Sequence, residues 1–563
     1  MKNLLEEVLK DIYLNLGYDL SFNIISESNR KELCDFQINS SFGLSKILKK
    51  APLEIASIIC EEINKLDNFN DYFKSVSCVA PGFINIVLSD NIINIALNKV
   101  INNKFGITPS NDEVYFLDYG GPNIAKPLHI GHLRPAIIGE SLKRILNLKG
   151  YKTISDAHFG DFGLQMGQVV YGILKDSKDI TSIDISYLNM IYPKISALCK
   201  EDEKVLEECK KITKDMQDGN MYGEYLEKII EVSLEDIKRI YNFLGVSFDL
   251  WLGERDSYSS VKPLIEFLKS KNLVRLDDGA YIIDVKKESD TKEVPPLILL
   301  KSDGAVMYST TDLATIYDRV NKYKIDHMLY VVDARQDIHF EQVFRASDIS
   351  GLFPYQNLEH IKFGTINGSD NKPFKTRSGD TVKLDDLIKE TKDLFISKRE
   401  NNKNLSESDL NKIVNSILKF ADLSNSRDKN YIFDLNKFSE VSGKTGPYIL
   451  YTALRIKKIL NDNKYDKKEI ISKIYNESDR NLRVKLTEFD KYLNLSVKER
   501  MPHFLCEYVF DLCNIINNFY QNNNIKNEED LEKKNDYLNI LDYSYKLIEV
   551  ILNALVIEIP NEM

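Results

Sequence analysis

The segment covering residues 114–157 limits the possible folds more than any other part of the chain. Its first five residues are mostly apolar, a loop rich in Gly, Pro and Asn follows, and helical spacing then runs from about 133 to 148. Gly150 ends the helical pattern, and residues 151–157 have the composition of a second strand. A strand, a crossover helix and another strand form a βαβ unit. The sequence therefore predicts an α/β fold with a parallel, doubly wound sheet.

The 563 residues are enough for three or four domains at about 100–200 residues each. Residues 1–109 mix helical and strand patterns, residues 110–395 alternate strands with helices, and residues 396–563 have helical spacing. We therefore expect three domains with these boundaries. They are an α+β N-terminal domain, a Rossmann-like doubly wound parallel-sheet catalytic domain with a helical insertion, and an all-α C-terminal helix bundle.

Shorter patterns locate individual elements. Residues 43–64 have helical spacing, residues 80–88 read as a turn followed by a strand, and residues 183–245 read as a charged helical insertion. Short apolar runs predict further strands at 329–332 and 361–364.

Charge and cysteine content restrict the function classes. The net charge is −10, so a nucleic-acid binder of this composition needs a local basic face for phosphate contacts. The seven cysteines are odd in number and include no C-x-x-C pair, which favours reduced thiols without disulfides or a zinc knuckle. The first 18 residues read as an amphipathic helix, and no apolar run approaches the ~18 residues of a membrane span. We expect a cytoplasmic monomer with no membrane partner.

The loop 120–134 carries the strongest chemical signal, G-G-P-N-I-A-K-P-L-H-I-G-H-L-R. His129 and His132 are three residues apart at a predicted helix start, so they can point the same way, and Gly131 leaves room for a nucleotide. A helix N-terminus offers free N–H groups and a positive dipole, both suited to phosphate. With Lys126, the two imidazoles predict a site that stabilises ATP phosphates in the transition state. A bare H-x-G-H is equally compatible with one structural histidine, but the full string is more specific.

This string resembles a known family. The sequence H-I-G-H at 129–132 matches the HIGH signature of class I aminoacyl-tRNA synthetases, and P-N-I-A-K-P-x-H-I-G-H-L-R resembles the arginyl-tRNA synthetases in particular. The resemblance covers nearly the whole chain in order. It implies catalytic roles for His129, His132, Lys126, Lys375 and Arg377. It implies that ATP contacts Pro122, Asn123, Ile124, Ala125, Lys126, Pro127, His129, Ile130, Gly131, His132 and Leu133.

The segment Y-S-T-T-D at 308–312 resembles the family's Y-x-T-x-D, which binds the substrate arginine. Its Tyr and Asp are spaced i,i+4, on one helical face, and a carboxylate matches the planar fork of a guanidinium. The resemblance implies that arginine contacts Asp118, Asn123, Glu254, Tyr308, Asp312 and Gln336. On the sequence alone, a surface residue is the more frequent reading of Glu254, and His339 is equally read as a structural residue.

Residues 160–167, G-D-F-G-L-Q-M-G, resemble the family's G-D-W-G-x-Q-x-G, with Phe162 in place of Trp. Asp156, His158 and Asp161 lie in or beside this segment. Each of the three is a candidate site residue or a simple loop and capping residue.

Residues 372–382 stand where the family carries its second signature, K-M-S-K-S, and resemble the arginyl variant F-K-T-R-x-G. The lysine that usually ends the signature is absent. The resemblance implies that Lys126 supplies its charge, and that Lys375 and Arg377 contact pyrophosphate. The alternative is a flexible basic loop.

Both ends of the chain also resemble this family. Residues 35–39 and 81–86 resemble its N-terminal domain, which touches the tRNA elbow, and residues 440–456 resemble the start of its helical anticodon-binding domain. Phosphate contacts and stacking on unpaired bases are the chemistry expected there. The implied tRNA-binding residues are Gln37, Asn39, Tyr448, Tyr451, Arg455 and Lys458. Core packing is the alternative for the aromatic residues.

The expected function is ATP-dependent ligation of L-arginine to tRNA(Arg) through an arginyl-adenylate, with release of AMP and pyrophosphate. Mg²⁺ is expected to accompany ATP, with no dedicated zinc or other structural metal. The resemblance also implies that tRNA binds before arginine is activated.

Three other functions fit parts of the pattern. Another class I synthetase is one, although the cysteinyl enzyme needs zinc ligands that the sequence lacks. A small-molecule nucleotidyltransferase shares H-x-G-H but not the long helical C-terminal region. A catalytically inactive RNA-binding relative would not need the intact His129, His132, Lys126 and Asp312.

Overall fold

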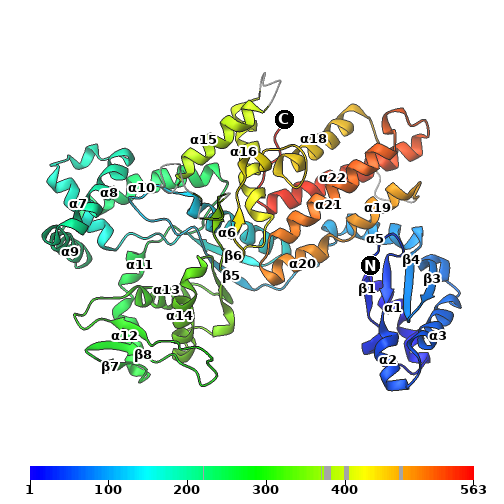
Figure 1. The fold of residues 1–563 in the computed structure, drawn as a ribbon, viewed down its shortest axis with the longest axis horizontal. Coiled ribbons are helices and arrows are strands. Elements are labelled where there is room, and N and C mark those ends of the chain that lie inside the picture. The colour runs from blue at the N-terminus through cyan, green and yellow to red at the C-terminus, as the bar shows by residue number, and fades with distance from the viewer. Residues whose placement is uncertain (220, 369, 373, 375–381, 399–404, 468–472) are drawn as a thin grey trace. The chain divides into compact units, whose positions relative to one another are not determined.

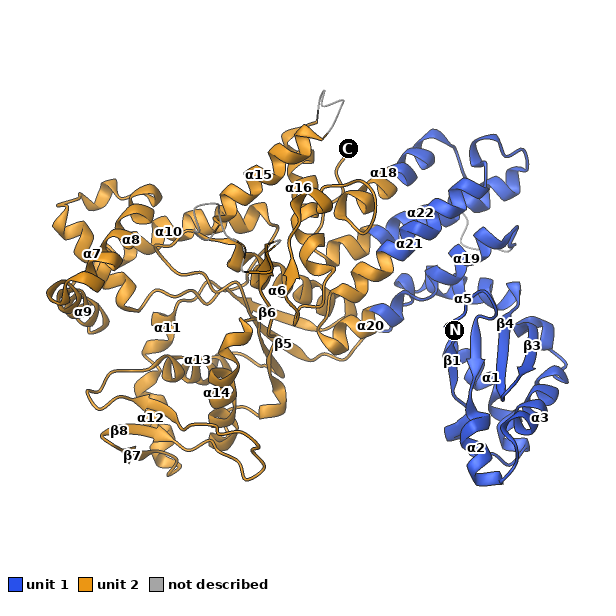
Figure 2. Ribbon diagram, viewed as in Figure 1, with its two compact units in different colours: residues 1–108, 455–492, 510–548 blue, residues 109–454, 493–509, 549–563 orange. Residues whose placement is uncertain are grey.

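The computed structural model forms two compact units (Figure 2). It describes residues 1–219, 221–368, 370–372, 374, 382–398, 405–467 and 473–563. Unit 1 contains residues 1–108, 455–492 and 510–548. Unit 2 contains residues 109–454, 493–509 and 549–563.

Unit 1 contains an antiparallel sheet in the order β1-β2-β4-β3. Its strands are β1 (Ile25–Glu27), β2 (Phe36–Ile38), β3 (Phe73–Val79) and β4 (Phe83–Leu88). Its N-terminal helices are α1 (Lys2–Asn15), α2 (Ser40–Leu48), α3 (Pro52–Asn64), α4 (Phe69–Tyr72) and α5 (Asp90–Asn102). Alternate residues of β4 are buried, as expected for a sheet with one face on a core. The strand predicted after the turn at 80–82 is therefore confirmed.

The helical pattern predicted over 43–64 is divided into two helices. Lys49 ends α2 in the left-handed region, with φ 54°, and Pro52 occupies the first turn of α3, where its missing N–H is not needed. Periodicity continued across this break, so the sequence pattern did not reveal it.

The C-terminal region is helical, as predicted. Its helices are α18 (Gly446–Asp462), α19 (Glu477–Leu486), α20 (Phe489–Glu499), α21 (His503–Asn522) and α22 (Leu531–Ala554). Between residues 405 and 445 lie α16 (Glu407–Leu423), α17 (Leu435–Phe438) and the short β13 (Tyr431–Ile432), which pairs in parallel with β12 (Ile366–Asn367).

The sheet of unit 2 is parallel and has the order β11-β10-β5-β6. Figure 1 labels two of its strands, β5 and β6. Its strands are β5 (Val114–Asp118), β6 (Lys152–Asp156), β10 (His327–Tyr330) and β11 (Leu358–His360). Helix α6 (Ile130–Lys149) connects β5 to β6, which confirms the predicted βαβ unit. The chain then returns on the other side of β5 to form β10. The strand order therefore reverses at β5, and such a reversal is where ligands bind in open α/β sheets.

One predicted strand was misplaced. Residues 361–364 were expected to form it, but β11 ends at His360, and beyond it only an isolated bridge joins Asp333 to Phe363. Buried Ile361 and Phe363 give this segment the alternation of a strand. Regular pairing stops because the neighbouring chain turns into a short helix at Ala334–Gln336.

Further helices of unit 2 lie between β6 and residue 397. They are α7 (Leu164–Lys175), α8 (Ile185–Glu201), α9 (Glu203–Gln217), α10 (Gly223–Phe243), α11 (Glu254–Tyr258), α12 (Val261–Ser270), α13 (Tyr308–Lys322), α14 (Asp337–Ser350) and α15 (Leu384–Ser397). Three of them, α8, α9 and α10, occupy the charged helical stretch predicted over 183–245. A small antiparallel sheet contains β7 (Arg275–Asp277), β8 (Ala280–Ile283) and β9 (Leu297–Leu300). Within the described ranges, no helix combines the length and hydropathy needed to cross a membrane.

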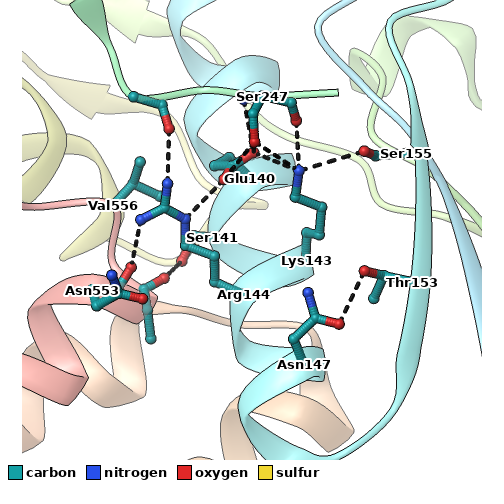
Figure 3. A network of polar contacts seen from close by, with 12 residues as sticks. Glu140, Ser141, Lys143, Arg144, Asn147, Thr153, Ser155, Ser247, Asn553 and Val556 are labelled. Atoms are coloured by element: carbon teal, nitrogen blue, oxygen red, sulfur yellow. Dashed lines mark hydrogen bonds and ion pairs between the residues drawn. The ribbon is translucent and has the colours of Figure 1, made fainter. Parts of the chain in front are cut away.

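Helix α6 is fixed along its C-terminal half by a polar network (Figure 3). The buried Glu140 accepts hydrogen bonds from the Ser247 backbone N–H at 3.0 Å and from Arg144 Nε at 2.8 Å. Lys143 Nζ donates to the Ser247 carbonyl at 2.5 Å, and Arg144 Nη1 donates to the Asn553 carbonyl at 3.1 Å. The helix is thus bonded to the segment after α10 and to the end of α22.

Nearer its start, α6 is joined to α16 by a buried ion pair. Arg134 Nε lies 2.9 Å from Asp422 Oδ2, and both residues are 1% exposed. Arg134 Nη1 also donates to the Gly364 carbonyl at 2.6 Å, and its guanidinium lies over the Tyr431 ring. Burial raises the pKa of Asp422 against the attraction of Arg134. Losing one partner would leave the other charge buried without compensation.

We predict that Asp422→Ala lowers the free energy of unfolding of unit 2 by about 3–5 kcal/mol, the usual cost of breaking a buried pair from one side. Urea unfolding followed by the fluorescence of Trp251, the one tryptophan of the chain, measures it. The matched control is Asp385→Ala, which removes a surface pair with Arg239 whose side chains are about half exposed. It should change the free energy by less than about 1 kcal/mol. Equal effects of both variants would contradict the prediction.

Candidate active site

The floor of the candidate site is a buried arginine between two carboxylates. Strands β5 and β6 end in Asp118 and Asp156, and Arg319 Nη2 of α13 lies 2.7 Å and 2.8 Å from an Oδ2 of each. The Arg319 guanidinium also stacks 4.3 Å above the Phe116 ring. Burial raises the pKa of Asp118, and Arg319 opposes that shift. Asp118, predicted to contact the substrate, therefore already pairs with a guanidinium of the protein.

The two histidines of the H-I-G-H segment cap the start of α6 reciprocally. The His129 backbone N–H donates to His132 Nδ1 at 3.1 Å, and the Gly131 N–H donates to His129 Nδ1 at 3.1 Å. The ring centroids are 4.0 Å apart. A side-chain carbon on Gly131 would lie 2.8 Å from the His129 ring, so this ring position requires glycine. The predicted common orientation of the two imidazoles follows from this capping.

These contacts also fix the state of both rings. An Nδ1 that accepts a hydrogen bond leaves the ring proton on Nε2 of a neutral imidazole. Burial and the charge of Lys126 lower the pKa of His129, and burial with neighbouring His129 lowers the pKa of His132 to about 3. At neutral pH both rings are therefore uncharged Nε2–H donors, and the positive charge beside them is that of Lys126.

The prediction of free N–H groups at the helix start was wrong. The Ile130 N–H donates to the Val382 carbonyl at 2.9 Å, the Gly131 N–H to His129 Nδ1, and the His132 N–H to the His129 carbonyl at 2.8 Å. The helix dipole and the imidazole Nε2–H groups remain for an anion. Lys375 and Arg377, predicted to contact pyrophosphate, lie outside the described residues.

Several residues predicted to bind arginine lie near one another. A carbon added to Gly160 would lie 2.8 Å from Asn123 Oδ1 and 3.7 Å from Glu254 Oε1, so these two side chains share one surface. Similarly, a carbon added to Gly163 would lie 3.3 Å from the Tyr308 hydroxyl. The Asn123 backbone is held there by a parallel bridge to Gly160.

Glu254 has an altered acidity. Burial raises its pKa to about 7, and the negative charges of Asp312 and Asp161 add to the shift, whereas His158 opposes it. Within the described part of the chain, neither Glu254 nor Asp312 forms a salt bridge with a lysine or arginine. Two neighbouring carboxylates without a basic partner of this kind form a site suited to a cation.

His339 is a residue whose role the sequence left open. Its Nε2 lies 2.5 Å from Asp312 Oδ2, so α14 orients the carboxylate carried by α13. Gln336, three residues earlier at the start of α14, is exposed. The i,i+3 spacing of Gln336 and His339 was visible in the sequence, but the contact between His339 and Asp312 was not.

His158 and Asp161 lie among these carboxylates. His158 has a φ of 36°, a strained region for a residue with a side chain, and such strain is common at functional sites. Burial raises the pKa of Asp161 to about 6. Both therefore influence the electrostatics of the candidate site, a role that the sequence had left undecided.

A cavity of about 630 Å³ adjoins the candidate arginine site. Its lining includes Phe162, Glu254, Tyr258, Met307 and Tyr308. Tyr308 is 65% exposed at this cavity. Among the described side chains, no cluster of three or more His, Cys, Asp or Glu residues could hold a metal ion.

Four of the predicted tRNA-binding residues belong to unit 1 and two to unit 2. In unit 1, Gln37 Nε2 donates to Asn85 Oδ1 at 2.8 Å, and Asn39 precedes α2. Also in unit 1, the Arg455 guanidinium lies 4.0 Å above the Tyr520 ring, and Lys458 is exposed. In unit 2, Tyr448 is half-buried and Tyr451 is 49% exposed.

Three family models match this chain. The catalytic domain of class I tRNA synthetases (R) matches residues 93–435, the arginyl tRNA synthetase N-terminal domain matches 1–88, and the DALR anticodon binding domain matches 449–563.

The similar proteins are arginine–tRNA ligases. One from Alkaliphilus oremlandii is 38% identical over 99% of this chain and 98% of its own length. One from Francisella tularensis subsp. tularensis is 36% identical over 100% of both chains. Two solved arginyl-tRNA synthetases share the fold. That of Thermus thermophilus has a TM-score of 0.80 at 18% identity over 100% of both chains, and that of Plasmodium falciparum has 0.78 at 23% over 100% of this chain and 99% of its own.

The catalytic-domain match over more than half of the sequence, together with the full-length identity to arginine–tRNA ligases, shows that this chain belongs to the arginyl-tRNA synthetases of class I.

Proposed function

We propose that the residues around the ends of β5 and β6 bind arginine and ATP together, and that this site performs the reaction of the family, ATP-dependent arginylation of tRNA(Arg). The observation that carries the proposal is the pair Glu254 and Asp312. Their neighbouring negative charges favour a cation, and a guanidinium matches carboxylates in both charge and shape. Tyr308 adds its hydroxyl beside them.

The first step joins arginine to AMP. The arginine carboxylate attacks the α-phosphorus of ATP, which forms arginyl-adenylate and releases pyrophosphate. The nucleophile is already ionised at neutral pH, so this step needs positioning and charge neutralisation rather than a general base. We assign neutralisation to Lys126 and hydrogen-bond donation to Nε2–H of His129 and His132. We propose that Gln336, Asp118 and Asn123 hold the backbone end of arginine.

Mg²⁺ in this proposal arrives on the phosphates of ATP. Burial and the charge of Lys126 lower the pKa of both imidazoles, His129 also acts on His132, and no carboxylate contributes to either shift. Mg²⁺ prefers carboxylate, phosphate and water oxygens, so phosphates and water suit it better than this part of the protein. Bound there, the ion would spread the negative charge that develops on the phosphates.

The second step transfers arginine to tRNA. A ribose hydroxyl at the tRNA 3′ end attacks the activated carbonyl and releases AMP. We propose that residues 1–109 bind the tRNA elbow, residues 110–395 perform catalysis and residues 396–563 bind the anticodon. The contacts proposed for tRNA are Gln37, Asn39, Tyr448, Tyr451, Arg455 and Lys458. We further propose a cytoplasmic monomer that activates arginine only with tRNA bound.

ATP–pyrophosphate exchange tests the function. We expect arginine-dependent exchange in the presence of tRNA(Arg) and none without it, measured as transfer of labelled pyrophosphate into ATP. Lysine in place of arginine is the control substrate and should give no exchange. Exchange without tRNA would contradict the tRNA requirement, and no arginine-dependent exchange in either condition would contradict the arginyl assignment.

Replacing Asp312 tests the guanidinium site. Asp312→Ala should lower kcat/KM for arginine at least about hundredfold, because losing one partner of a charge pair that bound arginine would bury costs about 2–5 kcal/mol. Steady-state aminoacylation over a range of arginine concentrations measures this. Asp318→Ala, on the same helix but paired with Lys322, is the matched control and should leave kcat/KM unchanged. The assignment fails if both variants behave alike.

The acidity of Glu254 predicts a pH dependence. Its pKa of about 7 means that the carboxylate is increasingly protonated, and so uncharged, as pH falls below 7. KM for arginine should therefore rise by as much as about tenfold per pH unit below that value. Aminoacylation kinetics between about pH 6 and 8 test this. Glu254→Gln should raise KM and remove the dependence, and a variant that kept the same pH profile would show that another group causes it.

A further inference from the structure

The ammonium group of Lys126 lies over an aromatic ring of the helical insertion. Lys126 Nζ is 4.8 Å from the centre of the Tyr192 ring, which is carried by α8. Among the residues that the structure describes, Lys126 forms no salt bridge. Its side chain and that of Tyr192 are both half-buried. The ring is therefore the contact that limits where this ammonium can lie.

Helix α8 has little freedom relative to the catalytic loop. A carbon added to Gly172 of α7 would lie 2.3 Å from Ile191, the neighbour of Tyr192, so α7 and α8 approach closely only because this residue is glycine. Helix α7 is in turn bonded to the loop before α6, since Gln165 Nε2 donates to the Ile124 carbonyl. The position of Tyr192 is thus set from the same loop that carries Lys126.

The backbone beside Lys126 is held by the insertion as well. Ala125 is buried with φ 60°, an unfavourable conformation for a residue with a side chain. Its N–H donates at 3.0 Å to Ser233 Oγ of α10, which itself donates to the Ile229 carbonyl at 2.7 Å. With the backbone fixed here, the direction of the Lys126 side chain remains to be determined by its own contacts.

Lys126 points its charge toward the H-I-G-H segment. Its positive charge contributes to the lowered pKa of His129 and of His132, which requires it to be near both rings. A carboxylate partner would hold the ammonium equally well but would neutralise the charge that a phosphate needs. An aromatic face attracts the cation while leaving its full charge available.

We propose that Tyr192 is a positioning residue for adenylate formation, which holds the Lys126 ammonium by a cation–π contact where the phosphates of ATP bind. This proposal rests on the proposed function, because it assumes that Lys126 contacts ATP. It makes α8 a functional part of the site, since the ring that orients a catalytic lysine belongs to the insertion.

The test compares Tyr192→Leu and Tyr192→Met, which remove the aromatic face, with Tyr192→Phe, which retains it. In arginine-dependent ATP–pyrophosphate exchange with tRNA(Arg), we expect kcat to fall about tenfold in the Leu and Met variants, with KM for arginine unchanged. The Phe variant should stay within about twofold of the unaltered enzyme. Tyr187→Leu is the matched control, because Tyr187 on the same helix forms a comparable contact with Lys178 away from the site.

A double-mutant cycle separates positioning from general damage. In a Lys126→Met background, Tyr192→Leu should cause no further loss, because the group it positions is gone. Equal losses in both backgrounds, a loss in Tyr192→Phe, or no loss in the Leu and Met variants would each overturn the proposal. Exchange by the unaltered enzyme separates a failure of the Tyr192 proposal from a failure of the proposed function. If it exchanges, these outcomes concern Tyr192 alone; if it does not, the proposed function is overturned and the positioning role with it.

Discussion

The ion pair of Arg319 with Asp118 and Asp156 is the constraint on which the candidate site depends. Two carboxylates at the ends of adjacent parallel strands would repel each other in a buried position, and Arg319 neutralises both. The loops that carry H-I-G-H and the residues around Gly160 leave the sheet at these two positions. The protein thus satisfies one pair of acids permanently with its own guanidinium. Glu254 and Asp312 are placed differently, because no arginine of the described structure pairs with them: His339 contacts Asp312, and His158 is the histidine whose charge acts on Glu254.

A second constraint is the distribution of charge around H-I-G-H. Reciprocal capping turns both Nδ1 atoms inward, so the histidines are neutral donors that also stabilise the start of α6. Burial, together with the nearby positive charge of Lys126, lowers the pKa of both rings and keeps them neutral. The pair is therefore both structural and suited to phosphate. The sequence posed a structural histidine and a phosphate-binding histidine as alternatives, but one ring can serve in both roles.

Sequence patterns predicted the features that depend on residues close together in the chain. The βαβ unit, the parallel sheet and the helical C-terminal region followed from periodicity and turn residues, and the H-I-G-H string indicated the family. Contacts distant in sequence were not predictable in this way. Arg319 lies seven residues after Asp312, on the same face of α13, but the two carboxylates that it contacts stand at the ends of β5 and β6. The N–H of Ile130 was expected to be free because nothing nearby in the sequence indicates that Val382 accepts its hydrogen bond.

The insertion illustrates why the catalytic loop cannot be understood from its own sequence. A backbone with Ala125 in the left-handed region is unfavourable by itself, and it persists only where surrounding groups compensate for it. Here the compensation comes from Ser233 and Gln165, on two helices that follow the loop in the chain. The 183–245 segment, which the sequence marks only as charged and helical, therefore does more than enlarge the domain. Because it supports both the backbone and the side chain at Lys126, changes in its packing are transmitted to the residue that carries the positive charge of the site.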